Sequence, residues 1–180
     1  MLGKGSKTAY LGLFCAAAIL LGSVEAMVPV FTTVPGMTLG LPNQAVVTVL
    51  YLYSWREAAL VSLVRITVNG LLFGNLFSFW FSLAGGLLSL AAMAAVKVLG
   101  LFDCTGVSLV GGIAHNAGQI AVAALLVDNV RVAYYFIPLV VTGLVAGVLI
   151  GLLSGILVRR LAPAAPKLRE DAKAEEKAGP

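Results

Sequence analysis

Six polar side chains interrupt the most apolar stretches of this sequence. They are Glu25, Arg65, Asn69, His115, Asn116 and Gln119. A charge at the centre of a bilayer costs about 2.5–3.5 kcal/mol even on the most lenient insertion scale, so such residues face a protein interior and take partners there. Arg65 and Asn69 are four residues apart, as are His115 and Gln119, so each pair shares one helical face. We expect these faces to enclose one polar site.

Two interpretations of this polar site remain open. In the first, Arg65 receives an anionic or carbonyl group of a small-molecule ligand, and the three amides hydrogen bond to that ligand. In the second, the residues form an internal network in which Arg65 pairs with Glu25. A proton relay through His115 and Glu25 is less favoured, because proton pumps carry more carboxylates inside the membrane.

The composition is that of an integral membrane protein. Of the 180 residues, 60% are hydrophobic and 11% are charged, whereas about a quarter of the residues in a soluble domain are charged. The net charge of +4 is concentrated at the chain ends and forms no basic stripe, so we expect no nucleic-acid partner. Cys15 and Cys104 have no metal-binding spacing. We expect no metal site and no intrinsic cofactor.

Six apolar segments predict an all-α bundle of six transmembrane helices within residues 1–160. The expected helices cover about 10–31, 45–53, 58–73, 76–98, 106–127 and 134–158. Turns or polar loops are expected at 32–43, 54–57, 74–75, 100–105 and 128–131. The second is too short to cross a bilayer as a straight helix, which favours a broken or re-entrant span. The first also has features of a secretory signal, but cleavage after Ala26 would leave an odd five spans. Residues 161–180 are predicted to form a charged, disordered cytoplasmic tail.

Basic residues near the segment ends predict the orientation. A cytoplasmic N-terminus places six of them inside and only Arg131 outside. The six are Lys4, Lys7, Arg56, Lys97, Arg159 and Arg160. This bias predicts that both termini are cytoplasmic and that the polar site lies in the outer half of the membrane. The aromatic cluster Phe77–Phe81 would then lie at the outer rim, as an interfacial belt or as the lining of a ligand pocket.

Small residues mark two helix-packing surfaces. Gly143, Gly147, Gly151 and Gly155 recur every four residues. They form a flat groove along the last helix. Another helix, of this chain or of a partner, must pack into that groove. Gly12 and Ala16 form a shorter surface on the first helix, which suits a partner or intramolecular packing equally.

Three stretches together resemble a known family. They are LGLPNQ at 39–44, VRITVNGLLFGNLFSFWFSLAGGLLS at 64–89 and GGIAHNAGQ at 111–119. They resemble the bacterial Gx transporters, many of which carry the name heptaprenyl diphosphate synthase component I. That family is similar to the substrate-binding S components of energy-coupling-factor transporters, which have six helices. The resemblance implies a place in the bacterial cytoplasmic membrane.

Three roles remain open, and the leading one is the substrate-binding subunit of a transporter that the resemblance implies. An S component would bind a flavin, a quinone or prenyl precursor, or another vitamin-like compound. It would dock through its first helix onto a membrane coupling protein with ATPases, so that only partner subunits hydrolyse ATP. The synthase name implies instead a membrane accessory to a separate prenyl synthase subunit, and the third role is in a membrane redox assembly. We expect no catalysis by the chain itself, because it lacks a Walker A loop, a GxSxG motif and aspartate-rich magnesium-binding segments.

Overall fold

Six α-helices make up the part of the chain that the computed structural model describes, namely residues 5–27, 40–73, 76–127, 134 and 136–163. The helices are α1 (Gly5–Met27), α2 (Asn43–Leu52), α3 (Trp55–Phe73), α4 (Leu76–Leu99), α5 (Cys104–Val127) and α6 (Phe136–Leu161). Four of them, α1, α4, α5 and α6, are long and apolar enough to cross a membrane. The chain is therefore a multi-pass helical membrane protein. The all-helical prediction is confirmed, and four of the six predicted spans have the length and composition of a span.

The start of α3 corrects the sequence-based boundary. The prediction placed a tight turn at 54–57 and began the helix near Ala58, but α3 begins at Trp55. The Ser54 hydroxyl accepts the backbone N–H of Arg56 at 3.2 Å and donates to the Glu57 carboxylate. Ser54 is therefore the N-cap of α3. The Ser-x-x-Glu spacing is that of a capping box, but Glu57 here binds the Ser54 hydroxyl and not its backbone N–H. The segment expected as a turn is thus the cap and first turn of α3.

Two residues of the predicted polar loop fix the neighbouring helix ends. The Asp103 carboxylate accepts the backbone N–H of Gly106 at 2.8 Å, which caps the N-terminus of α5. Gly100 has φ +67°, the left-handed conformation that glycine adopts just after a helix. Therefore α4 ends at Leu99, and α5 begins at Cys104, two residues before its expected start.

Several predicted features lie outside the described residues. They are most of the turn-rich segment 32–43, the turn at 74–75, the loop at 128–131 and the tail beyond residue 163. Residues 28–31, predicted as the end of the first helix, also lie outside them. These features stay predictions.

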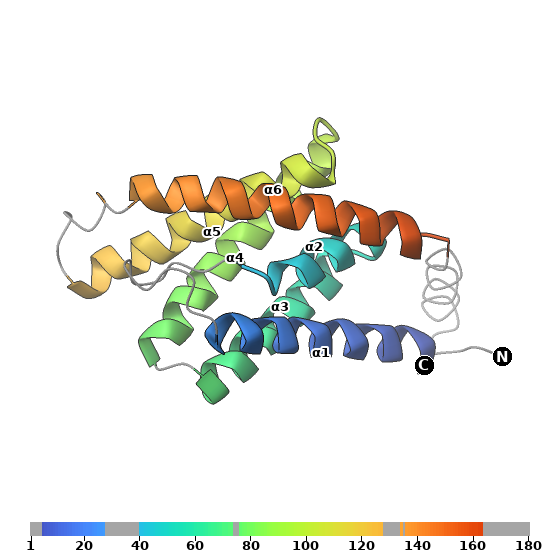
Figure 1. Cartoon of the computed structure of the whole chain (residues 1–180), viewed down its shortest axis with the longest axis horizontal. Coiled ribbons are helices and arrows are strands. Elements are labelled where there is room, and N and C mark those ends of the chain that lie inside the picture. The colour runs from blue at the N-terminus through green and yellow to red at the C-terminus, as the bar shows by residue number, and fades with distance from the viewer. Residues whose placement is uncertain (1–4, 28–39, 74–75, 128–133, 135, 164–180) are drawn as a thin grey trace.

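The shortest helix, α2, lies inside the bundle (Figure 1). It packs against α1, α3 and α6 and also contacts α5. Seven of its 10 residues are buried, and they form much of the hydrophobic core. The long helices α4, α5 and α6 pack side by side, while α1 packs on α2 and α3. The first residues of α1 and the last residues of α6 lie at the same end of the bundle in Figure 1.

Charged side chains from other helices stabilise both ends of α2. With 10 residues this helix is about 15 Å long, which is half of the ~30 Å hydrocarbon core. The unpaired backbone groups at its ends therefore need hydrogen-bond partners inside the bundle. The Glu25 carboxylate of α1 accepts the backbone N–H groups of Gly40 and Leu41 at 2.8 and 3.1 Å, just before α2 begins. Lys97 of α4 donates to the carbonyl oxygen of Leu50 near the other end. An acid at the N-terminus and a base at the C-terminus also match the helix dipole.

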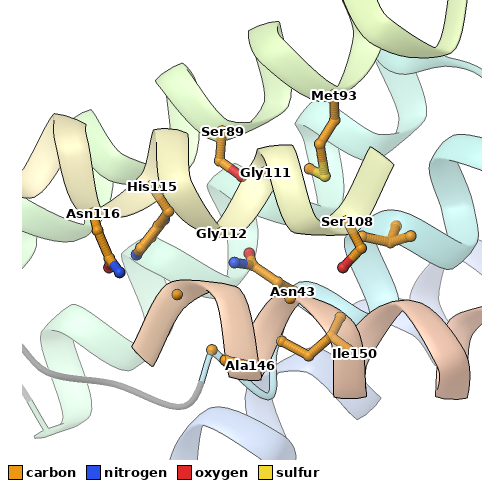
Figure 2. A pocket seen from close by; sticks show the side chains of 14 residues that line it. Asn43, Ser89, Met93, Ser108, Gly111, Gly112, His115, Asn116, Ala146 and Ile150 are labelled. Atoms are coloured by element: carbon orange, nitrogen blue, oxygen red, sulfur yellow. The ribbon is translucent and has the colours of Figure 1, made fainter. Parts of the chain in front are cut away.

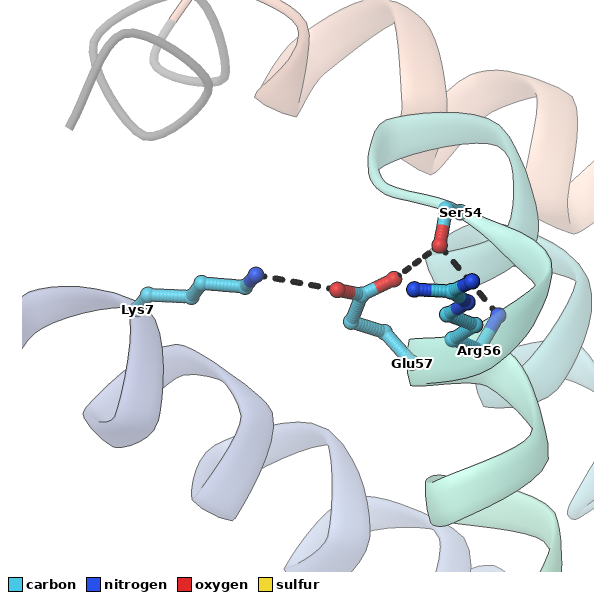
Figure 3. A network of polar contacts seen from close by, with 4 residues as sticks. All are labelled: Lys7, Ser54, Arg56 and Glu57. Atoms are coloured by element: carbon cyan, nitrogen blue, oxygen red, sulfur yellow. Dashed lines mark hydrogen bonds and ion pairs between the residues drawn. The ribbon is translucent and has the colours of Figure 1, made fainter. Parts of the chain in front are cut away.

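A polar contact joins α1 to the beginning of α3 (Figure 3). The Lys7 ammonium forms an ion pair with the Glu57 carboxylate at 2.9 Å. Burial alone raises the pKa of Glu57, but hydrogen bonds from Ser54 and Lys7 outweigh this effect and lower the pKa from its ordinary value of 4.5 to about 2. The carboxylate is therefore held in its charged form, and it anchors the first turns of α1 and α3 to each other.

The regularly spaced glycines of α6 face α5. A Cβ added at Gly147 or Gly151 would lie 2.8 or 2.6 Å from a backbone Cα of α5, and one added at Gly143 would also clash with that helix. At Gly155 the nearest atom would be 3.9 Å away, an ordinary contact. Thus α5 of the same chain fills the groove along the first three glycines. By contrast, Gly12 on α1 has nothing within 4 Å of the added Cβ.

Candidate functional site: a buried polar cavity

A partly open cavity lies between α2, α4, α5 and α6 (Figure 2). Its polar lining comprises Asn43, Ser89, Ser108, His115 and Asn116, and its larger apolar lining residues are Val47, Met93, Ala146 and Ile150. The empty volume is about 360 Å³ including the open side, and the centre of a water-sized molecule can occupy about 20 Å³ of it. That space holds one or two waters, or a group of a few atoms at the end of a larger ligand.

A tight crossing of α4 and α5 positions His115. A Cβ added at Gly85 of α4 would lie 2.9 Å from the His115 ring, so glycine at this position leaves room for the imidazole. One helical turn beyond, a Cβ added at Gly118 would lie 2.7 Å from the carbonyl oxygen of Ala84. The close approach leaves His115 only 8% exposed, and its Nδ1 has no hydrogen-bond partner among the described residues.

Asn116, the next residue, is held between α5 and α6. Its Nδ2 donates to the carbonyl oxygen of Leu139 in the first turn of α6. That turn contains Pro138, which has no N–H to donate and is tolerated near a helix start. Asn116 thereby joins α5 to α6, two of the helices that line the cavity.

Arg65 reaches the cavity through Asn43. Its Nη2 donates to the Asn43 side-chain oxygen at 2.7 Å, and Asn43 lines the cavity. The Arg65 side chain is buried, with 7% exposed, and its Nε has no partner in the part of the chain that is described. Glu25 acts on Arg65 electrostatically, and the direct pairing of the two that the sequence allowed stays a prediction.

The remaining predicted site residues do not line the cavity. Glu25 is engaged by the backbone before α2. Asn69 packs onto α1 at Gly22, where an added Cβ would lie 1.9 Å from the Asn69 Nδ2. Gln119 is buried, and its Oε1 lacks a partner among the described residues. The structure thus brings Arg65, His115 and Asn116 to one site, and it places Glu25 and Asn69 at the packing surface of α1.

Three lining residues were missed by the sequence-based reasoning. They are Asn43, Ser89 and Ser108. Ser108 lies seven residues before His115, so the two share a helical face, and this spacing is a usable signal. Asn43 lies in the short stretch LGLPNQ, at the end of the segment that was predicted only as a turn. Nothing local distinguishes Ser89 from other small residues of α4.

The aromatic cluster at the start of α4 does not line the cavity. Phe77 and Trp80 are 60% and 49% exposed, and Phe79 packs edge-to-face on Trp80 with ring centres 5.7 Å apart. The cluster is therefore oriented outward. Of the two predicted interpretations, this placement favours an interfacial belt.

The polar groups that line the cavity are hydrogen-bonding groups. Its polar lining consists of amides, hydroxyls and one imidazole, and it contains no carboxylate. The Ser89 hydroxyl is buried and has no partner among the described residues. No group of three or more His, Cys, Asp or Glu side chains within the described segments is arranged to hold a metal ion. A buried polar group without a partner costs about 1–3 kcal/mol, so a ligand or water that hydrogen bonds here gains that much.

Long apolar helices around a buried polar cavity define a multi-pass membrane protein. The family model described as heptaprenyl diphosphate synthase component I matches residues 14–157. The chain therefore belongs to the heptaprenyl diphosphate synthase component I family. The matched region contains every lining residue of the cavity. No curated protein and no solved structure gives a significant match to the chain.

Proposed function

We propose that this chain is the membrane component of a prenyl diphosphate synthase system, and that it binds a small ligand and leaves prenyl transfer to a separate subunit. Family membership over residues 14–157 is the observation that carries this proposal. The family's name supports association with a synthase. The buried cavity, lined by neutral hydrogen-bonding groups, supports a role in holding a ligand.

The positions of the acidic residues support a non-catalytic role. Prenyl diphosphate chemistry needs clustered aspartates that hold magnesium, and the sequence has no aspartate-rich segment. Each acid among the described residues has a structural contact instead: Glu25 accepts backbone N–H groups before α2, Glu57 pairs with Lys7, and Asp103 caps α5. Converting any one of them into a magnesium ligand would remove a helix cap or an interhelical contact.

Affinity purification from native membranes tests this proposal. The chain, tagged at its C-terminus and extracted in a mild detergent, is expected to bring with it a soluble protein rich in aspartate motifs that has prenyl transferase activity. Mass spectrometry identifies the partner, and incorporation of labelled isopentenyl diphosphate measures its activity. Recovery of the chain without any prenyl-transferring partner would contradict the proposal.

A second candidate function is the substrate-binding subunit of a transporter. The uncovered small-residue surface of α1 favours it, because Gly12 and Ala16 are exposed and no atom lies within 4 Å of a Cβ added at Gly12. A coupling protein's helix would approach closely at such a surface. Flavin, quinone and prenyl precursors are the ligands that the family resemblance implies for this role.

The variant Gly12→Leu distinguishes the two candidates. It is expected to leave the thermal stability of the purified chain unchanged, because the side chain meets open space. Under the transport hypothesis it releases a coupling protein and its ATPases from the purified complex. If no ATPases co-purify with the unaltered chain, the transport hypothesis fails.

For the topology, we propose that both termini face the cytoplasm of a bacterial cell across the cytoplasmic membrane. The bias of basic residues supports this orientation, and so does the position of the described ends of α1 and α6 at one end of the bundle. Labelling of single cysteines at the start of α1 and the end of α6 from either side of the membrane tests it.

A further inference from the structure

We infer that the cavity binds the hydroxyl end of an uncharged amphiphile, such as a long-chain alcohol, through the Ser89 hydroxyl and the side-chain amides of Asn43 and Asn116. This inference rests on the proposed function only in taking the cavity as the ligand site. It adds the charge and the polar end group of the ligand, and it names the side chains that recognise that group.

The charged side chains next to the cavity balance each other and stay outside its lining. Glu25 acts on Arg65 electrostatically, and neither side chain lines the cavity. The lining itself contains no carboxylate, ammonium or guanidinium group. An anion or a cation in the cavity would therefore meet no opposite charge there, and a buried charge without a partner is strongly unfavourable. The cavity favours an uncharged group.

The hydroxyl of Ser89 is a buried polar group that needs a partner. Ser89 is 1% exposed, and its hydroxyl has no hydrogen-bond partner among the described residues. It lines the cavity, and Figure 2 shows its oxygen directed from α4 toward α5. The facing residue of α5 is Gly111, where an added Cβ would lie 3.2 Å from the Ser89 oxygen. Glycine at this position thus leaves the hydroxyl uncovered for a ligand atom.

The two amides of the lining offer opposite hydrogen-bonding groups. A guanidinium has only donors, so Asn43 turns its oxygen toward Arg65 and keeps its Nδ2 as a donor for another partner. Asn116 donates through its Nδ2 to the carbonyl oxygen of Leu139, which leaves its oxygen as an acceptor. Both residues line the cavity, and Figure 2 shows both amides between α5 and α6. A hydroxyl both donates and accepts, so it matches both amides, whereas a carbonyl or an ether only accepts.

The size of the cavity limits the polar end of the ligand to one small group. The centre of a water-sized molecule can occupy about 20 Å³, which is room for one or two waters. A hydroxyl is about as large as one water, whereas a diphosphate or a ring system is much larger. The apolar side chains of Val47, Met93, Ala146 and Ile150 line the remainder. A hydroxyl with an apolar chain that leaves through the open side fits both features.

Photolabelling of the purified full chain in lipid nanodiscs tests this inference. The probe is hexadecan-1-ol with a diazirine near its hydroxyl end, and mass spectrometry locates the labelled residues. We expect labelling in the segments of α2, α4, α5 and α6 that line the cavity. Unmodified hexadecan-1-ol should compete at least about tenfold more effectively than hexadecyl methyl ether, which cannot donate a hydrogen bond, and than palmitate, which is charged.

Three results would overturn the inference. They are equal competition by the alcohol and the ether, stronger competition by palmitate, and labelling confined to lipid-facing side chains, because the cavity would then hold only water. Farnesol is compared with hexadecan-1-ol to identify the chain. The hydroxyl chemistry predicts that both alcohols compete, and the stronger competitor tells whether the ligand is a branched isoprenoid alcohol or a straight-chain one.

Two variants locate the site. Ser89→Ala removes one hydroxyl and should weaken binding of hexadecan-1-ol about threefold to tenfold. Asn43→Asp replaces the Nδ2 donor with a carboxylate beside Arg65, so the protein should stay folded while this affinity falls at least about tenfold. Ser62→Ala is the matched control, because Ser62 is also buried but does not line the cavity. Unchanged binding in both folded variants would reject the site.

This inference and the proposed function can fail separately. If the alcohol does not label the cavity while a prenyl synthase still co-purifies, the hydroxyl site is wrong and the proposed function stands. If the alcohol labels the cavity but no synthase co-purifies, the proposed function fails and the hydroxyl site stands.

Discussion

The guanidinium of Arg65 donates a hydrogen bond to the side-chain oxygen of Asn43 across 2.7 Å. This contact joins the middle of α3 to the first residue of α2. It gives the one cation buried in α3 a partner, and it turns the donor group of Asn43 away from that cation. Arg65 therefore belongs to the internal hydrogen-bond network, and it also orients a residue that lines the cavity.

A double-mutant cycle measures this contact. Asn43→Leu removes the side-chain oxygen that accepts from the buried Arg65, and we expect it to lower the free energy of unfolding by about 1.5–3 kcal/mol. Arg65→Leu with Asn43→Leu removes both polar groups, and such paired replacements are often neutral or stabilising. The double variant should therefore be more stable than Asn43→Leu alone, as measured by unfolding in mixed micelles. Additive losses from the two substitutions would show that the residues do not interact.

The α5–α6 crossing depends on glycine at position 147. A Cβ there would lie 2.8 Å from backbone, so Gly147→Ala must push the two helices apart, at a cost of about 1–3 kcal/mol. Gly147→Leu should prevent correct folding. Gly155→Ala is the control, because its Cβ makes an ordinary 3.9 Å contact and alanine raises helix propensity by up to about 1 kcal/mol. Thermal unfolding in detergent compares the variants, and equal stability of Gly147→Ala and Gly155→Ala would contradict this packing.

The contact between Lys7 and Glu57 should weaken in acid. Its hydrogen bonds lower the pKa of Glu57 from 4.5 to about 2, so the stability it contributes is fully present above the unfolded value of 4.5. That contribution is lost as the pH falls through the folded value near 2. The measurement is the difference in thermal stability between the unaltered chain and Glu57→Gln at several pH values. We expect a difference on the order of 1 kcal/mol at pH 7 that shrinks between pH 4.5 and pH 2. A difference that is constant over this range would rule out this carboxylate as its source.

The positions of the helices were largely predictable from sequence. Hydropathy alone marks α4, α5 and α6, because long apolar runs in lipid must form helices to satisfy their backbones. The repeat of glycine along α6 also indicated a close helix contact, since small residues permit it. The helix that fills that groove, α5, could not be named from sequence, because the repeat carries no information about its partner.

The arrangement around α2 was much less predictable. The sequence shows that Glu25 and Lys97 are unusual charges at or near apolar segments, but not that both contact the ends of the same short helix. Those contacts link residues 15 to 47 positions apart, and no periodic pattern encodes them. Asn43 was missed for the same reason, because its importance comes from Arg65, 22 residues away. The Ser-x-x-Glu cap of α3, by contrast, was a local signal and was available.

Prenyl chain elongation in a reconstituted membrane tests the central claim most directly. The catalytic subunit that co-purifies with this chain is assayed with farnesyl diphosphate and labelled isopentenyl diphosphate, alone and with the chain in nanodiscs. We predict that the chain by itself forms no product, that it raises the rate or the product length of the catalytic subunit, and that Asn43→Asp abolishes this gain. Product formation by the chain alone, or a catalytic subunit that is unaffected by its presence, would contradict the account.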